Sequence, residues 1–72
     1  MTPIQTLFAH TRAAHRTALN SAETMMTAVA DHDDEYVGST VSELEGAAAK
    51  MELSARTLRA QIAVFRHATE KS

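Results

Sequence analysis

The second half of the chain carries one uninterrupted heptad of apolar residues. Its positions alternate in steps of three and four, so they fall along one side of a helix. A helix with such a seam can pack lengthwise against a partner helix, and we therefore expect a helix over residues 39–67. The seam consists of Val41, Leu44, Ala48, Met51, Ala55, Leu58, Ile62 and Phe65.

The first part of the chain predicts another long helix, over residues 3–30. Thr2 can cap it, Pro3 suits its first position, and Gln5 can close a capping box with Thr2. No further glycine or proline occurs before Gly38. An apolar stripe is formed by Ile4, Phe8, Ala18, Ala22, Met25 and Val29, with Thr11 and His15 in its gaps.

Residues 31–38 break both patterns and predict a bend. They open with four strongly polar residues, Asp31 to Asp34. The start of the second helix has two readings: an aspartate at 33 or 34 caps it early, or Thr40 and Glu43 form a later capping box. Residues 68–72 are expected to be a frayed tail, and residues 1–72 to be one domain.

A short bend between two long helices predicts an all-α fold, an antiparallel two-helix hairpin. A chain of 72 residues without cysteine has little core of its own, and its alanine-rich seams yield little hydrophobic energy. We therefore expect a homodimer in which two hairpins form a four-helix bundle. The expected oligomer seam contains Phe8, Ala22, Met25, Leu44, Met51, Leu58, Ile62 and Phe65.

The charge and the hydropathy of the chain argue against nucleic acids and membranes as partners. The charges are also unevenly distributed along the hairpin. A net charge of −2 offers no surface for nucleic-acid phosphates, and no apolar run is long enough to cross a membrane. With no secretory signal at the start, the expected location is the cytoplasm. Residues 31–45 hold six acids and no base, whereas arginines gather at the open end. Glu52 and Arg56 are spaced for an i,i+4 ion pair.

Candidate chemistry is sparse. The four histidines have no spacing typical of a metal site, and there is no cysteine to assist them. No nucleophile with a paired base, phosphate loop or glycine-rich fingerprint is present, and a two-helix chain lacks a cleft for a small-molecule substrate. We expect no enzyme activity, no cofactor and no metal.

Residues 51–66, which end in Ala63-Val64-Phe65-Arg66, resemble the last helix of methyl-accepting chemotaxis receptors. The resemblance covers roughly residues 39–66 and is weaker in the first helix. It implies a cytoplasmic four-helix rod. The receptors' glycine-containing signalling tip, ligand domain and transmembrane helices have no counterpart here, so the resemblance implies a small receptor-like accessory protein.

The same resemblance extends to the receptors' adaptation sites. Small residues at 39/40 and 47/48 flank an acidic position at Glu43, but Leu44 stands where the methyl-accepting side chain should be. The implied partner is the receptor methyltransferase, or receptor helices, and the implied role is to modulate adaptation. The expected partner-binding residues are Glu43, Glu45, Arg56 and Arg59.

Other interpretations remain open. Glu43 can simply close a capping box with Thr40, and Glu45 can simply be solvated. Tyr36-Val37-Gly38 lies at the bend, where small hairpins exported by specialised secretion systems carry Trp-x-Gly. A third reading is a regulatory dimer that binds another helix, with no link to chemotaxis.

Overall fold

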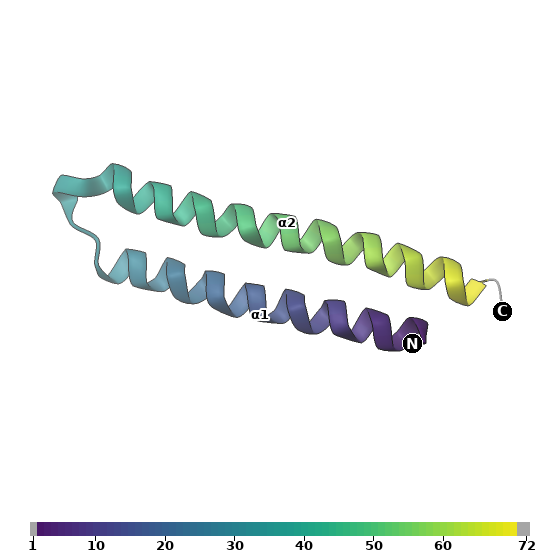
Figure 1. The fold of residues 1–72 in the computed structure, drawn as a ribbon. Coiled ribbons are helices and arrows are strands. Elements are labelled where there is room, and N and C mark those ends of the chain that lie inside the picture. Colours follow the sequence, from purple (N-terminus) through teal and green to yellow (C-terminus); the bar gives the residue numbers. More distant parts are fainter. Residues whose placement is uncertain (1, 71–72) are drawn as a thin grey trace.

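Two long α-helices lie side by side and run in opposite directions (Figure 1). The computed structural model describes residues 2–70. In that range α1 (Pro3–Ala30) and α2 (Val37–Glu70) are joined by a single 3₁₀ turn, η1 (Asp34–Tyr36), and there is no strand. The fold is therefore all-α and has the hairpin topology that the sequence predicts.

Helix α1 begins with the expected capping box. The Thr2 hydroxyl oxygen accepts a hydrogen bond from the Gln5 backbone N–H at 3.2 Å, and the Gln5 side-chain oxygen accepts one from the Thr2 N–H at 3.0 Å. Two backbone donors that no helical carbonyl can reach are thus satisfied.

The early of the two readings for the second helix is correct. A carboxylate oxygen of Asp33 accepts the Glu35 N–H at 3.0 Å and caps η1, which leads directly into α2 at Val37. Thr40 therefore lies inside the helix and is not its cap. Helix α2 starts two residues before the expected position and continues to Glu70, three residues beyond the expected end. The last two residues of the expected frayed tail lie outside the described range.

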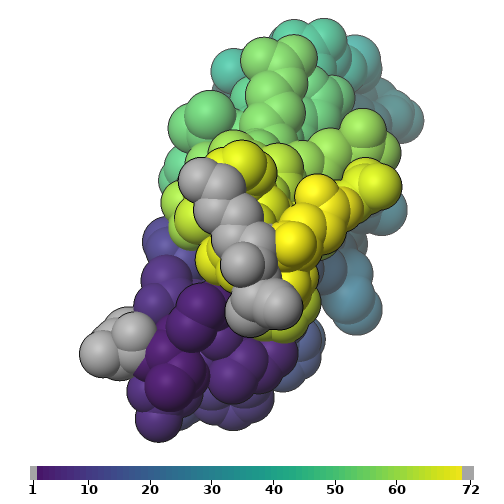
Figure 2. Space-filling view, turned by 90° about the vertical axis from the view of Figure 1, so that its right-hand side faces the viewer, coloured from purple at the N-terminus to yellow at the C-terminus, as the bar shows by residue number. Residues whose placement is uncertain are grey.

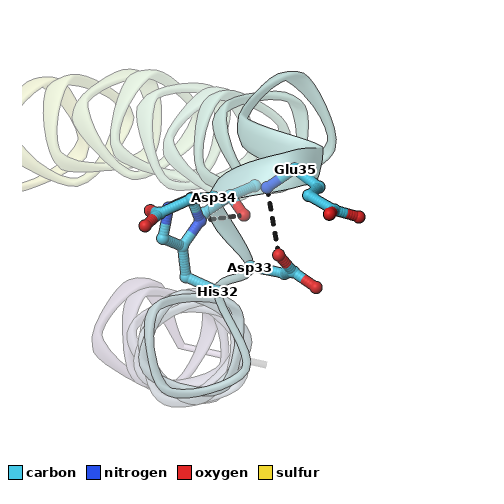
Figure 3. Close-up of polar contacts among 5 residues, drawn as sticks. His32, Asp33, Asp34 and Glu35 are labelled. Carbon is cyan, nitrogen blue, oxygen red and sulfur yellow. Dashed lines mark hydrogen bonds and ion pairs between the residues drawn. The ribbon is translucent and has the colours of Figure 1, made fainter.

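The side chain of His32 makes polar contacts with the bend and with α2 (Figure 3). His32 follows α1, and its Nδ1 lies 2.8 Å from the Thr40 hydroxyl oxygen on α2. Its Nε2 lies 3.1 Å from a carboxylate oxygen of Asp34 in η1. The imidazole ring of His32, which follows α1, therefore contacts both η1 and α2. The Thr40 hydroxyl, one of the two expected caps of the second helix, takes part in this contact.

Small side chains line the contact between the helices. Only Ser21, Ala28 and Ala47 are buried among residues 2–70, and no large side chain is fully buried there. The other contact positions are half-buried and keep heptad spacing on both helices. On α1 the contact positions are Leu7, His10, Ala14, Thr17, Ser21 and Ala28; on α2 they are Thr40, Leu44, Ala47, Met51, Ser54, Leu58, Gln61, Phe65 and Ala68.

The hairpin is long and thin. Its Cα atoms extend over 59 × 14 × 11 Å, and the described residues hold two α-helices side by side. Figure 2 looks along the rod from its open end. The radius of gyration is 16.6 Å, against about 11 Å for a compact chain of this length. The accessible surface is 5771 Å², whereas a compact protein of this mass exposes about 4,400 Å². The isolated hairpin thus leaves an excess of about 1,400 Å² uncovered.

Replacing Gly46 by alanine is expected to stabilise the hairpin. Gly46 lies inside α2, and a Cβ atom added there meets nothing within 4 Å. The substitution removes a poor helix former, so the free energy of unfolding should rise by up to about 1 kcal/mol. Urea unfolding at a fixed protein concentration measures it. The neighbouring Ala47→Leu is the contrast: Ala47 is buried between the helices, and overpacking there should cost about 1–3 kcal/mol.

The His32 bridge is expected to behave as a coupled pair. His32→Ala and Thr40→Val each remove one partner of the 2.8 Å contact, so each should lower the free energy of unfolding by about 0.5–1.5 kcal/mol. The double variant should lose less than the sum, because both changes remove the same interaction. A double-mutant cycle measures this coupling. Strict additivity would show that the bridge contributes nothing to stability.

Candidate interaction surface

The apolar stripe of α1 and half of the apolar seam of α2 lie next to the contact positions, not on them. On α1, Phe8, Ala22 and Val29 each follow a contact position by one residue, and on α2 Val41 and Ile62 do the same. One residue corresponds to a turn of about 100° around the helix axis. The stripes therefore point sideways, out of the groove between the helices.

Both stripes lie on the same side of the hairpin. An antiparallel helix pair has a local two-fold axis perpendicular to the plane of the two helices, so equivalent positions on the two helices lie on one side of that plane. The positions that follow the contact residues are equivalent in this sense. The apolar residues among them, together with Ile4 and Met25 in heptad register with Ala18, form a surface here named the apolar face. It consists of Ile4, Phe8, Ala18, Ala22, Met25 and Val29 of α1 and Val41, Ala48, Ala55 and Ile62 of α2.

The large side chains of the apolar face are open to solvent. Phe8 is 62% exposed, Val29 61% and Ile62 47%. Ala22, Met25 and Ala48 are half-buried, because they lie beside the groove between the helices. Large apolar residues also occur elsewhere on the surface, among them Leu53 at 65%, but only on this side do both helices contribute a heptad row.

The residues expected as an oligomer seam divide between two surfaces. Leu44, Met51, Leu58 and Phe65 occupy contact positions and are half-buried towards α1 within the hairpin. Phe8 and Ile62 are exposed on the apolar face, and Ala22 and Met25 lie at its border with the groove. Half of the α2 seam residues therefore pack against α1 within the hairpin. The other half belong to the apolar face.

The four expected partner-binding residues are exposed but are not gathered in one place. Glu45 and Arg59 follow the contact positions Leu44 and Leu58, so they border the apolar face. Glu43 lies on the opposite side of the hairpin, and Arg56 is on the surface of α2 that points away from α1. A partner that touched all four would have to wrap around the helix.

The side opposite the apolar face carries a polar groove. Its volume is about 340 Å³, and it runs over the middle of the rod between the helices. Asn20, Thr24, Glu43 and Lys50 line it together with small residues. The two sides of the hairpin thus differ: one has a groove lined by Asn20, Glu43 and Lys50, and the other carries the apolar rows of both helices.

Ion pairs contribute little to the folded hairpin. Within residues 2–70 they join His32 to Asp34 and Arg66 to Glu70, the latter at 3.1 Å between exposed side chains. The expected pair between Glu52 and Arg56 is not formed there. Most charged side chains are therefore free to meet a partner.

Membrane spans, metal sites and similarity to known proteins also bear on the function. Neither helix, over the residues described, is long and apolar enough to cross a membrane. Across the same residues, no three histidine, aspartate or glutamate side chains are grouped so that they could hold a metal ion. No known protein family, curated protein or solved structure matches this chain.

Sequence reasoning found the large contact residues of α2 but missed its small ones, the contact positions of α1 and the His32 bridge. The contact positions of α1 are mostly small or polar, so no hydrophobic pattern marks them. One signal was available: the heptad row Thr40, Ala47 and Ser54 contains only small side chains, which allow two helices to approach closely. The His32 bridge joins residues eight apart across a turn, and no sequence pattern predicts that.

Proposed function

We propose that this chain is a non-enzymatic helical interaction protein whose apolar face packs against a second helical hairpin and completes a four-helix bundle. The observation that carries the proposal is the position of the two apolar stripes on the same side of the rod. A stripe on one helix alone would bind a single helix. Two adjacent stripes present the flat apolar surface that one hairpin needs against another.

The dimensions of the hairpin support this function. A standard protein interface buries about 800 Å² on each partner. The excess surface of about 1,400 Å² estimated above is more than enough to supply it. At about 25 cal/mol per Å² of apolar surface, covering the exposed apolar side chains of this face contributes favourable energy to association. A dimer is accordingly the proposed working state.

We further propose that the cellular partner belongs to bacterial chemotaxis: the receptor methyltransferase or the helices of the receptors themselves, met in the cytoplasm. The resemblance of residues 39–66 to the last receptor helix supports this choice. Glu43, the acidic residue of the adaptation-like frame, is exposed at the edge of the polar groove. Leu44, which stands at the methyl-accepting position, is turned towards α1. The methyltransferase would thus meet the small residues that flank this position but no side chain that it can methylate. The proposed effect is therefore to modulate adaptation by competition.

Ile62→Glu is expected to weaken the dimer. Burying an isoleucine contributes about 1.5–3 kcal/mol, and each dimer contains the substituted residue twice, so the dissociation constant should rise at least about tenfold. Sedimentation equilibrium across a dilution series measures it.

Leu53→Glu is the matched control for that measurement. Leu53 is 65% exposed, but it lies on the side of the polar groove, next to Ala13 and Thr17. Its replacement should leave the dissociation constant within about twofold, since it is outside the interface. Equal weakening by both changes, or a wild-type chain that stays monomeric at millimolar concentration, would contradict the proposed use of the apolar face.

Glu43→Lys is expected to abolish capture of the chemotaxis methyltransferase. The tagged chain is mixed with the purified methyltransferase from the same cell, and bound enzyme is quantified. Glu35→Lys reverses an exposed acid of the bend that does not line the surface around Glu43, and it should leave capture unchanged. If the wild-type chain binds neither the methyltransferase nor receptor helices, the chemotaxis assignment fails, whereas the bundle proposal is judged by sedimentation alone.

A further inference from the structure

A row of four charges follows the outer edge of the apolar face on α2. Glu45, Glu52, Arg59 and Arg66 follow the contact positions Leu44, Met51, Leu58 and Phe65 by one residue each. They are therefore spaced by seven and lie in one line along the helix. All four side chains are exposed. Read from the bend towards the open end, the row has two acids and then two arginines.

When two copies of α2 run antiparallel, the order of charges on one copy is complementary to the order on the other. If a second α2 runs antiparallel alongside the first, with the two-fold axis midway between Glu52 and Arg59, Glu52 lies opposite Arg59 of the second copy. The same axis places Glu45 opposite Arg66 of the second copy. Each acid then meets a base, and the symmetry repeats both pairs.

We propose, on the basis of the proposed function above, that the occupant of the apolar face is a second copy of this chain packed with its bend at the opposite end of the bundle. The two-fold axis is perpendicular to the rod. Each α2 then lies beside the α2 of the second copy, and each α1 beside its α1. The interface is isologous and closed, so association ends at the dimer.

The alternative dimer, with both bends at the same end, uses none of these charges. In that arrangement each α2 lies beside the α1 of the second copy. The corresponding edge of α1 carries Phe8, His15, Ala22 and Val29, without a carboxylate or an arginine. It would also bring together the two acidic bends, each with six acids and no base in residues 31–45, and like charges at close range repel.

The apolar row of α2 also fits this axis. It runs beside the charged row and consists of Val41, Ala48, Ala55 and Ile62. With two antiparallel α2 helices related near residue 55, Ala55 meets its own copy and Ala48 meets Ile62 of the second copy. Small side chains at the crossing allow close approach, and a small residue opposite a large one fills the space between the helices. The apolar row is therefore compatible with the register that the charged row selects.

Arg66 has to change its partner when the dimer forms. In the single hairpin its Nε lies 3.1 Å from a carboxylate oxygen of Glu70, and both side chains are mostly exposed. An exposed pair of this kind holds its members weakly. Glu45, Glu52 and Arg59 have no ion pair within residues 2–70, so they meet their partners without losing one.

A charge-swap series tests the arrangement. Glu52→Arg places two arginines opposite each other, and Arg59→Glu places two glutamates opposite each other. Each single change should raise the dissociation constant about tenfold in low salt. The double variant Glu52→Arg/Arg59→Glu should restore wild-type affinity, and mixing the two single variants should yield a heterodimer. The difference should shrink in about 1 M salt.

Matched controls and a distance measurement complete the experiment. Glu43→Arg and Arg56→Glu make the same charge changes away from the apolar face and should leave the dissociation constant unchanged. Because the chain has no cysteine, Glu35→Cys carries a single spin label at the bend. The proposed dimer predicts a label separation of about 60 Å from the helical rise.

The outcomes are distinguishable. A dimer with labels within about 30 Å of each other, or with no difference between the swap and control variants, would overturn the proposed arrangement and leave the proposed bundle intact. A wild-type chain that remains monomeric would overturn both. Weakening by each single change, restoration by the double change and a long label separation together support the bend-apart dimer.

Discussion

The small side chains between the two helices are the constraint on which the structure depends. Ser21, Ala28 and Ala47 are buried because the helices approach closely, and small residues allow that approach. They also supply little apolar area, so this contact alone contributes little energy. The hairpin is consequently a rod with two helices across its section, and large apolar residues such as Phe8 and Val29 remain exposed. The proposed bundle follows from that excess of uncovered surface.

Each helix carries two heptad rows side by side. The contact row holds the hairpin together. The small or polar contact residues of α2 from Thr40 to Gln61 are each followed by an apolar residue of the apolar face, whereas the large ones are followed by the charged row. Because the helices are antiparallel, the second rows of both helices appear on the same side. The polar groove with Glu43 and Lys50 occupies the other side. A two-sided rod of this type is suited to lateral association.

Side-chain contacts in the bend join the two helices. Asp33 caps the 3₁₀ turn, and His32 reaches both Asp34 and Thr40. These contacts join the end of α1 to the first turns of α2 and fix the rotation of one helix relative to the other. That rotation decides which residues of each heptad meet inside the hairpin, and hence which residues are left to form the apolar face.

The sequence by itself determined the two helices, the capping box at Thr2, the antiparallel hairpin and the residues that are apolar, because periodicity and capping are local properties of the chain. It left two starts open for the second helix, and the structure selected Asp33. Only the tertiary structure decided how each helix is turned. Small residues such as Ala47 and Ser54 carry no hydrophobic signal, yet they take the contact positions, since close backbone approach depends on the fit between two surfaces. For that reason Phe8 and Ile62 were recognised as seam residues from their spacing, while their exposure on one common side became visible only when the helices were placed together.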